Sequence, residues 1–379
     1  MTRDTLRAED ILRRAHAVGQ YYGFTPLTAL AATARGQNKK AEYPETMAGV
    51  VLDPLAELVA GFLKHCRALV PSARTPLFLW HSNIAPGRPA PRKVNVQFHA
   101  LGSDRPLADA LVIRALVALT RDLTGREPVV RINSMGDKET RARYARELGN
   151  FFKKRAQTLP EECVNSAKHD VFAAAELAVA KMCAEDLPSP TDHLSDQSRK
   201  RFEELLEYLE RTKTPYELSH TLISRGPSWS ETCFEISAAG ERVAWGSRYG
   251  DLARHFFKTL PTPAVGAVLH VAALRGAVAK AKKPPRLRFA FVHIGDEAKQ
   301  LSLGLAEEFK KARLALSQDI GLESLAEQMH LVERRNPSYL LIMGRKEALE
   351  HSAILRNRLT QEEWVLPLAK LTDRLRSIG

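Results

Sequence analysis

Cysteine is scarce in this sequence: only four of the 379 residues are cysteines, and no two of them form a CxxC pair. This spacing argues against a disulfide framework and against a zinc site, and it is typical of reduced cytosolic thiols. Long apolar runs are also missing, because the longest, at 264–279, is interrupted by His270 and Arg275 and is too short to cross a bilayer. The N-terminus is charged from its third residue and lacks the apolar segment of a secretory signal. We therefore expect a cytoplasmic protein with no metal site and no membrane partner.

Acidic residues are in the minority, since 44 Asp and Glu face 56 Lys and Arg and leave a formal net charge of +12. This excess favours a polyanionic partner, because Lys and Arg neutralise the phosphates of nucleic acids. The hydrophobic fraction of 44% is that of an ordinary globular chain. A chain of 379 residues is longer than one hydrophobic core usually organises, so we expect more than one domain.

Two loop-like stretches divide the chain. Residues 187–197 are rich in Pro, Ser and Asp, and 280–286 is a charged segment whose paired prolines cannot continue a helix. Before the second stretch, strand-like and helical segments alternate, and two of the strands flank a hairpin turn at 237–240. The pattern predicts an α+β core over 1–279 with a mostly antiparallel sheet and a helical insertion at about 138–212. The predicted strands are 77–80, 95–99, 217–223, 232–236 and 241–245, and the predicted helices are 107–123, 139–157, 169–184 and 198–211.

The segment after the paired prolines has a different pattern of apolar residues. Residues 287–294 are apolar and β-rich, 301–316 has the apolar spacing of a helix, and 339–343 is a short run typical of a buried strand. Strand, helix and strand within about a hundred residues predict a small, largely separate α/β domain over 286–379.

Short motifs spread along the chain point to one known family. In chain order they are Thr2–Asp4, Tyr21–Phe24, Pro44–Val50, Gln97–Gly102, Arg131–Asp137, Ser224–Ile236 and Gly246–Asp251, followed in the tail by Ser324–Gln328, Leu341–Gly344 and Arg356–Asn357. Together, and in this order, they resemble the motifs of histidyl-tRNA synthetases, class II enzymes that activate histidine with ATP. The resemblance implies a class II synthetase-like antiparallel core, an anticodon-binding-like C-terminal domain and a homodimer.

The resemblance also assigns candidate site residues. It places Glu45, Asp104, Arg225, Arg248 and Tyr249 around a pocket for an amino-acid-like ligand, with Arg225 as the catalytic candidate and ATP and Mg as cofactors if the protein is active. Each residue has an ordinary structural alternative. Glu45 could favour a helix N-terminus, Arg225 could lie in a turn, and the pair at 248–249 could support the sheet.

The positions that carry the family's chemistry are only partly kept. Class II activation uses one arginine of motif 2 and one of motif 3 to hold the ATP phosphates through charge-assisted contacts. Where motif 2 should lie, Leu79–Asn83 contains no arginine, and where motif 3 should end, the chain reads His270–Ala273. Arg275, two positions further on, would point to another side of a helix. Because the loss of each phosphate-binding arginine typically lowers the rate about a hundredfold or more, the sequence predicts impaired adenylation.

Six cations of the C-terminal domain are candidates for RNA binding, because single-stranded loops are recognised by stacking on the bases and by contacts to the base edges from a basic surface. They are Arg334, Arg335, Arg345, Lys346, Arg356 and Arg358. Three functions remain open. The chain could be a synthetase-like protein that binds tRNA or another structured RNA with impaired amino-acid activation. It could instead be a divergent active histidine–tRNA ligase, or a synthetase-like regulatory subunit or amino-acid sensor.

Overall fold

The computed structural model describes residues 8–28, 54–66, 69, 76–85, 93–223, 229–257, 262–271, 287–314 and 316–378. Its larger part is an eight-stranded sheet in the order β1-β2-β3-β8-β7-β6-β4-β5. All neighbouring strands are antiparallel except the pairs β1–β2 and β4–β5, which confirms the predicted, mostly antiparallel sheet. The strands are β1 (Thr25–Pro26), β2 (Leu77–Ala85), β3 (Lys93–Leu101), β4 (Val129–Ser134), β5 (Tyr216–Leu218), β6 (Ser230–Ala238), β7 (Glu241–Arg248) and β8 (Ala264–His270).

Helices cover both faces of this sheet. On one face lie α1 (Ala8–Tyr21) and α4 (Pro106–Thr124), within a large hydrophobic cluster that includes Phe98 of β3. On the other face lie α3 (Pro54–Cys66) and α9 (Gly250–Phe257), within a second cluster. Helix α4 is buried along almost its whole length, as its apolar residues on all sides require. It begins with Pro106, and Gly125, which follows its last residue and has a φ of 68°, caps the C-terminus.

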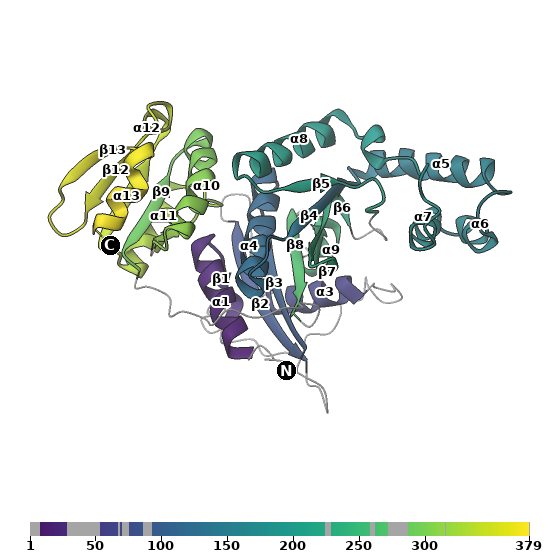
Figure 1. The fold of residues 1–379 in the computed structure, drawn as a ribbon, viewed down its shortest axis with the longest axis horizontal. Helices are drawn as coiled ribbons and strands as arrows, with labels where there is room; N and C mark the ends of the chain where they lie inside the picture. The colour runs from purple at the N-terminus through teal and green to yellow at the C-terminus, as the bar shows by residue number, and fades with distance from the viewer. Residues whose placement is uncertain are drawn as a thin grey trace.

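The first three helices of the insertion extend away from the sheet, whereas its last helix packs against α4 (Figure 1). It contains α5 (Lys138–Lys154), α6 (Glu161–Ala167), α7 (Val171–Ala180), a 3-10 turn at Pro190–His193 and α8 (Asp196–Arg211). The predicted helix over 169–184 is too long, since α7 ends at Ala180 and Met182 adopts a φ of 54°. The predicted strand over 217–223 is also too long, because β5 ends at Leu218 and a turn follows.

The C-terminal domain has a five-stranded sheet in the order β10-β9-β11-β12-β13. Strands β10, β9 and β11 are parallel, and β11, β12 and β13 are antiparallel. The predicted helix over 301–316 is wrong at its end, because α10 stops at Lys311 and Leu316 begins β10. The elements are β9 (Phe289–His293), α10 (Asp296–Lys311), β10 (Leu316–Gln318), α11 (Leu325–Arg335), β11 (Tyr339–Met343), α12 (Arg345–Leu349), β12 (Ser352–Asn357), β13 (Glu363–Pro367) and α13 (Leu368–Ile378).

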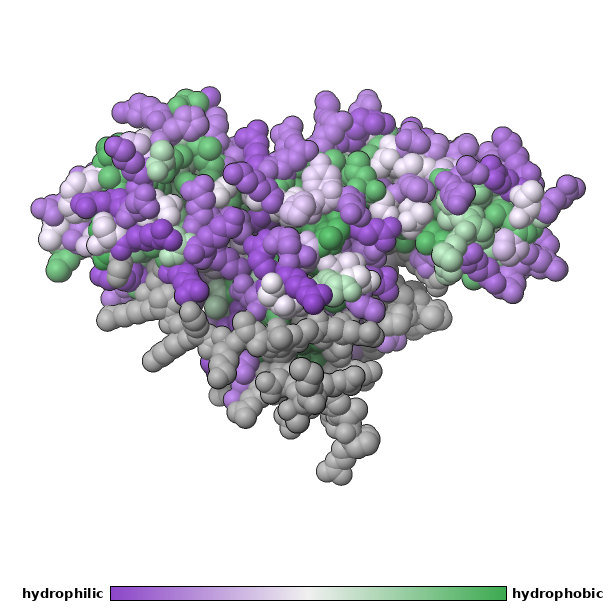
Figure 2. Space-filling view, viewed as in Figure 1, coloured by the Kyte–Doolittle hydropathy of each residue, from purple (hydrophilic) through white to green (hydrophobic). Residues whose placement is uncertain are grey.

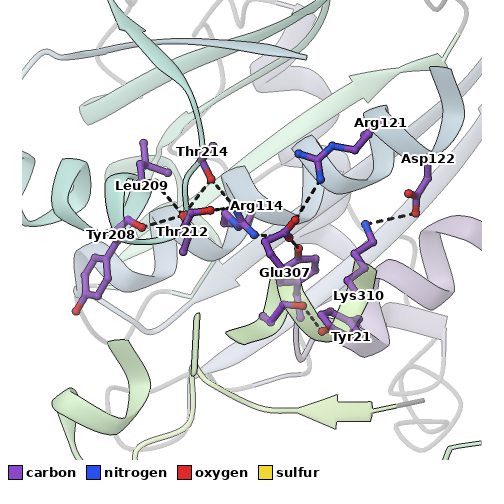
Figure 3. Close-up of polar contacts among 12 residues, drawn as sticks. Tyr21, Arg114, Arg121, Asp122, Tyr208, Leu209, Thr212, Thr214, Glu307 and Lys310 are labelled. Carbon is purple, nitrogen blue, oxygen red and sulfur yellow. Dashed lines mark hydrogen bonds and ion pairs between the residues drawn. The ribbon is translucent and has the colours of Figure 1, made fainter. Parts of the chain in front are cut away.

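The sequence predicts a largely separate domain, but the domain packs on the core. One continuous hydrophobic cluster joins α1 and α4 to α10 and the small sheet. A partly buried carboxylate reinforces the contact: Glu307 of α10 forms an ion pair with the buried Arg114 of α4 and accepts hydrogen bonds from Tyr22 at 2.6 Å and Arg121 at 3.1 Å. Figure 3 shows Glu307 between the two arginines, with Lys310 reaching Asp122 beside them.

The face of the molecule seen in Figure 2 is mostly hydrophilic, with small hydrophobic patches over the insertion and the C-terminal domain. Among the helices that the structure describes, none combines the length and the apolar character needed to cross a membrane.

Candidate functional site

Two adjoining hollows lie where the motif segments at 131–137, 230–236 and 246–251 meet. The smaller, of about 240 Å³, is bordered by Asp104, Glu231 and Arg248, among others. The larger, of about 610 Å³, lies between α5, α9 and Phe172 of α7. The two share a border of five residues, Asp137, Lys138, Ser230, Asp251 and Arg254, and we call them together the motif hollow.

Arg248, the last residue of β7, is held by the first turn of α4. Its Nε lies 3.0 Å from both carboxylate oxygens of Asp109, and its terminal nitrogens donate to the carbonyls of Ser103 at 3.2 Å and Arg105 at 2.9 Å. Both side chains of the Arg248–Asp109 pair are buried. These contacts use most of the five N–H donors of the guanidinium, so Arg248 fixes the start of α4 to the sheet.

Asp104 lies next to this buried pair but faces solvent. Its side chain is 70% exposed, and its Oδ1 accepts a hydrogen bond from Arg201 of α8 at 2.9 Å and lies 3.6 Å from Arg248. The structure thus brings together Asp104 and Arg248, two of the predicted site residues. It adds Arg201 and Asp109, which sequence reasoning missed because they are remote in sequence and match no motif of the family.

Glu231 completes the charged group at the smaller hollow. It adopts a φ of 50° in the irregular start of β6, and its Oε1 accepts from the Ser198 hydroxyl at 3.1 Å. Burial raises the pKa of Glu231, against the opposing effect of Arg201 and Arg248. The charges around this hollow therefore largely compensate one another within the protein.

Tyr249 points to the opposite side, into the cluster beneath α3. Its hydroxyl lies 2.7 Å from Nδ1 of His99, and Nε2 of His99 lies 3.0 Å from Oε1 of Gln97. Since burial lowers the pKa of His99, the imidazole is neutral. The Tyr249 hydroxyl then donates to Nδ1, and Nε2–H donates to Gln97. Phe62 of α3 stacks on the imidazole with 3.7 Å between ring centroids. His99 is therefore a fully buried, packed core residue.

The segment at 131–137 builds the turn from β4 into α5. Gly136 has a φ of 62°, and a Cβ there would lie 2.6 Å from Thr140. Asp137 caps α5 by accepting from the Thr140 amide at 2.8 Å, and it accepts a second hydrogen bond from the Ser195 hydroxyl at 2.7 Å. This motif shapes one wall of the hollow.

The described residues at the motif 2 and motif 3 positions supply no cation to hold the ATP phosphates. At the motif 2 position, Leu79 and Trp80 are buried, and burial together with His65 lowers the pKa of His81, so that this histidine is neutral at pH 7. At the motif 3 position, burial and Arg242 lower the pKa of His270, whose Nδ1 lies 3.0 Å from Asn95 Oδ1. Within the described ranges, no group of three His, Cys, Asp or Glu could hold a metal ion. Glu45, Arg225 and Arg275 lie outside the described residues.

The six candidate RNA-binding cations divide between two ends of the small sheet. The register pairs Tyr339, at the start of β11, with Asn357, at the end of β12. The cations near these two positions therefore lie at one end of the sheet, and they are Arg334, Arg335, Arg356 and Arg358. Arg345 and Lys346 follow β11 and lie at the other end. Several already have partners. Arg335 contacts the Asp319 carboxylate at 2.5 and 3.0 Å, Arg356 pairs with Glu363, and Arg345 lies 3.2 Å from Glu297. The guanidinium of Arg358 donates to Asn336 at 2.9 Å, and Arg334 and Lys346 are exposed.

Known proteins resemble this chain along most of its length. The family model described as an anticodon binding domain matches residues 288–378. The histidine–tRNA ligase of Desulfatibacillum aliphaticivorans is 29% identical over 296 residues, which cover 76% of this chain and 70% of the relative. That of Geobacillus sp. (strain WCH70) is 28% identical over 301 residues, which cover 74% and 70%.

Among solved structures, the apo histidyl-tRNA synthetase of S. aureus superposes with a TM-score of 0.50 at 18% identity and covers 99% of each chain. The fold of the core and of the C-terminal domain is thus that of a class II synthetase with its anticodon-binding domain. The order of the motifs, the match of the C-terminal domain and the similarity to histidine–tRNA ligases agree, and along most of its length the chain is similar to, though divergent from, the histidyl-tRNA synthetases.

Proposed function

We propose that this protein is a synthetase-like tRNA-binding protein whose amino-acid activation is impaired. The observation that carries the proposal is the chemistry at motifs 2 and 3, where the family needs cations and the described residues supply apolar or neutral side chains. Arg248, a buried cation at the border of the motif hollow, is already paired with Asp109. The C-terminal domain that the family uses for anticodon binding is retained.

The first test is histidine-dependent ATP–pyrophosphate exchange. We expect a rate lower by roughly four orders of magnitude than that of a histidine–tRNA ligase with complete motifs assayed in parallel. The phosphate-binding arginines of motifs 2 and 3 are both missing, and each typically contributes about a hundredfold. Exchange near the ordinary rate that disappears in Arg225→Ala would overturn the proposal. It would instead support the alternative, a divergent active histidine–tRNA ligase, which is the activity that the similar proteins are named for.

The second test is tRNA binding by the full chain. We expect affinity to fall steeply between low and moderate salt, since each neutralised phosphate releases counterions. Arg334→Glu, at the end of α11, should weaken binding by roughly three- to tenfold and reduce the salt slope by about 1. The exposed Arg13 of α1 supplies the matched control, and Arg13→Glu should leave binding almost unchanged. Equal losses in both variants, or affinity that salt does not change, would contradict an RNA surface on this domain.

The remaining expectations stay predictions. A homodimer and a small amino-acid-like ligand at Glu45, Asp104 and Arg225 follow from the family resemblance, and a cytoplasmic location follows from the composition and the N-terminal sequence. If the ligand is retained, Asp104 is the described residue that can meet it, because its carboxylate faces solvent at the edge of the hollow.

A further inference from the structure

Two cysteines of the insertion lie together and have no part in the proposed function. Cys163 is in the first turn of α6, and Cys183 follows the end of α7, so the α6–α7 hairpin brings the two residues to the same end. Both belong to the hydrophobic cluster of the insertion. The Cys183 thiol is near enough to Cys163 to raise the pKa of that thiol, and it donates to the Ala178 carbonyl at 3.4 Å. All four cysteines of the chain are free thiols.

The two thiols differ in access to solvent. Cys183 is partly exposed, next to Met182, whereas Cys163 is fully buried. Lys181 forms an ion pair with Glu162 at 2.7 Å, directly beside Cys163, and its ammonium opposes the burial that raises the pKa of that thiol. An oxidant from solvent therefore meets Cys183 first, and Cys163 stands behind it as the second thiol.

The other two cysteines differ in each of these respects. Cys66 of α3 and Cys233 of β6 are both buried, and neither has a second cysteine among its contacts. Burial raises the pKa of Cys66 and raises that of Cys233 to about 12. These two thiols are internal controls within the same chain.

We propose that Cys183 and Cys163 are a peroxide-sensitive thiol pair that closes into a disulfide. The Cys183 thiolate attacks a hydroperoxide, the O–O bond breaks, and Cys183 becomes a sulfenic acid while the other oxygen leaves as hydroxide. The Cys163 sulfur then attacks the Cys183 sulfur, an S–S bond forms and the S–O bond breaks. The leaving hydroxide takes up the Cys163 proton as water, so two thiols are oxidised by two electrons and one peroxide is reduced.

The disulfide would join the start of α6 to the end of α7 and close the hairpin covalently. Helix α7 also carries Phe172, which borders the motif hollow and lies 4.3 Å from the guanidinium carbon of Arg141 of α5. A closed hairpin has fewer open conformations, so its amides should exchange more slowly with solvent. The oxidation state of the pair would thus set how rigidly Phe172 is held at the hollow. This inference is independent of the tRNA-binding proposal.

The experiment exposes the reduced, folded full chain to hydrogen peroxide, blocks remaining thiols with N-ethylmaleimide and maps tryptic peptides by mass spectrometry without reductant. Lys168 and Lys181 lie between the two cysteines, so trypsin places them on separate peptides and a disulfide appears as a linked pair. We expect this linked pair to dominate, to disappear with dithiothreitol and to form equally in Cys66→Ser. Amide exchange in α6 and α7 should slow by about tenfold or more on oxidation.

Two variants distinguish the roles of the thiols. In Cys163→Ser, dimedone should label a sulfenic acid at Cys183, because no second thiol resolves it. In Cys183→Ser, Cys163 should remain unlabelled, and far-ultraviolet circular dichroism should show both variants folded. Stable dimedone labelling of Cys183 in the unmodified sequence without any linked pair would overturn the proposal. Linkage to Cys66 or Cys233 at a similar yield would overturn it as well.

Discussion

Replacing Asp109 with alanine should destabilise the protein by about 3–5 kcal/mol, because it leaves the Arg248 guanidinium buried without its counter-charge. The Asp109 side chain is 0% exposed and that of Arg248 is 4% exposed, so water cannot easily replace the lost carboxylate. The loss should also free the start of α4, which Arg248 ties to β7. Urea unfolding followed by circular dichroism measures the change as a shift of the transition midpoint at constant slope.

Asp104→Ala is the matched control for this result. Asp104 also lies next to Arg248, at 3.6 Å, but its side chain faces solvent, so we expect a loss below about 1 kcal/mol. If the two variants lose the same stability, the buried pair is not what anchors α4.

Glu307→Ala should cost a similar amount, about 3–5 kcal/mol, since it leaves Arg114 buried and without its partner in the C-terminal domain. The same change removes the acceptor of Tyr22 and Arg121. Unfolding in urea again gives the magnitude. Glu297→Ala, which removes only the exposed contact to Arg345 at 3.2 Å, should change stability by less than about 1 kcal/mol. A large effect of Glu297→Ala would show that the charge of α10, and not the pairing of Glu307 with the buried Arg114, determines docking.

The contribution of Glu307 should depend on pH in a known direction. Burial alone would raise the pKa of Glu307, but Arg114, Tyr22, Lys310 and Arg121 outweigh it and lower that pKa below its usual range. The folded pKa is then below the unfolded one of about 4.3, so the stabilisation is complete above the unfolded pKa and is lost as pH falls through the folded value. The difference between the unmodified protein and Glu307→Ala should therefore shrink in acid.

Local patterns in the sequence predicted much of this fold. The hairpin of β6 and β7 followed from apolar strands around the turn at Ser237–Gly240, and the register confirms it. Strand β10, in contrast, has only three residues, too few to show a period, and so Leu316 was assigned to the preceding helix. The helix predicted over 169–184 failed because its apolar residues continue past the point where the backbone turns at Met182.

The candidate site was less predictable than the fold. Motif resemblance drew attention to Arg248, but nothing in the sequence pairs it with Asp109, which lies 139 positions away. The same applies to Arg201, whose helix has the composition of a solvated surface although its side chain reaches Asp104. Long-range partners of this kind depend on how strands and helices meet, and a single sequence does not show where they meet. Tyr249 illustrates the reverse case, since a motif position turned out to face the packed core.

The docking of the C-terminal domain on α1 and α4 has a geometric consequence. Because one hydrophobic cluster and the ion pair of Glu307 with the buried Arg114 join the two parts, the small sheet has a fixed distance and angle to the large one. An RNA bound to the small sheet would therefore meet the core in a single orientation. Partners would then be selected by the span between their two contact points as well as by the groups that each point touches. A structured RNA that is one helical turn too short or too long would reach only one of the two parts.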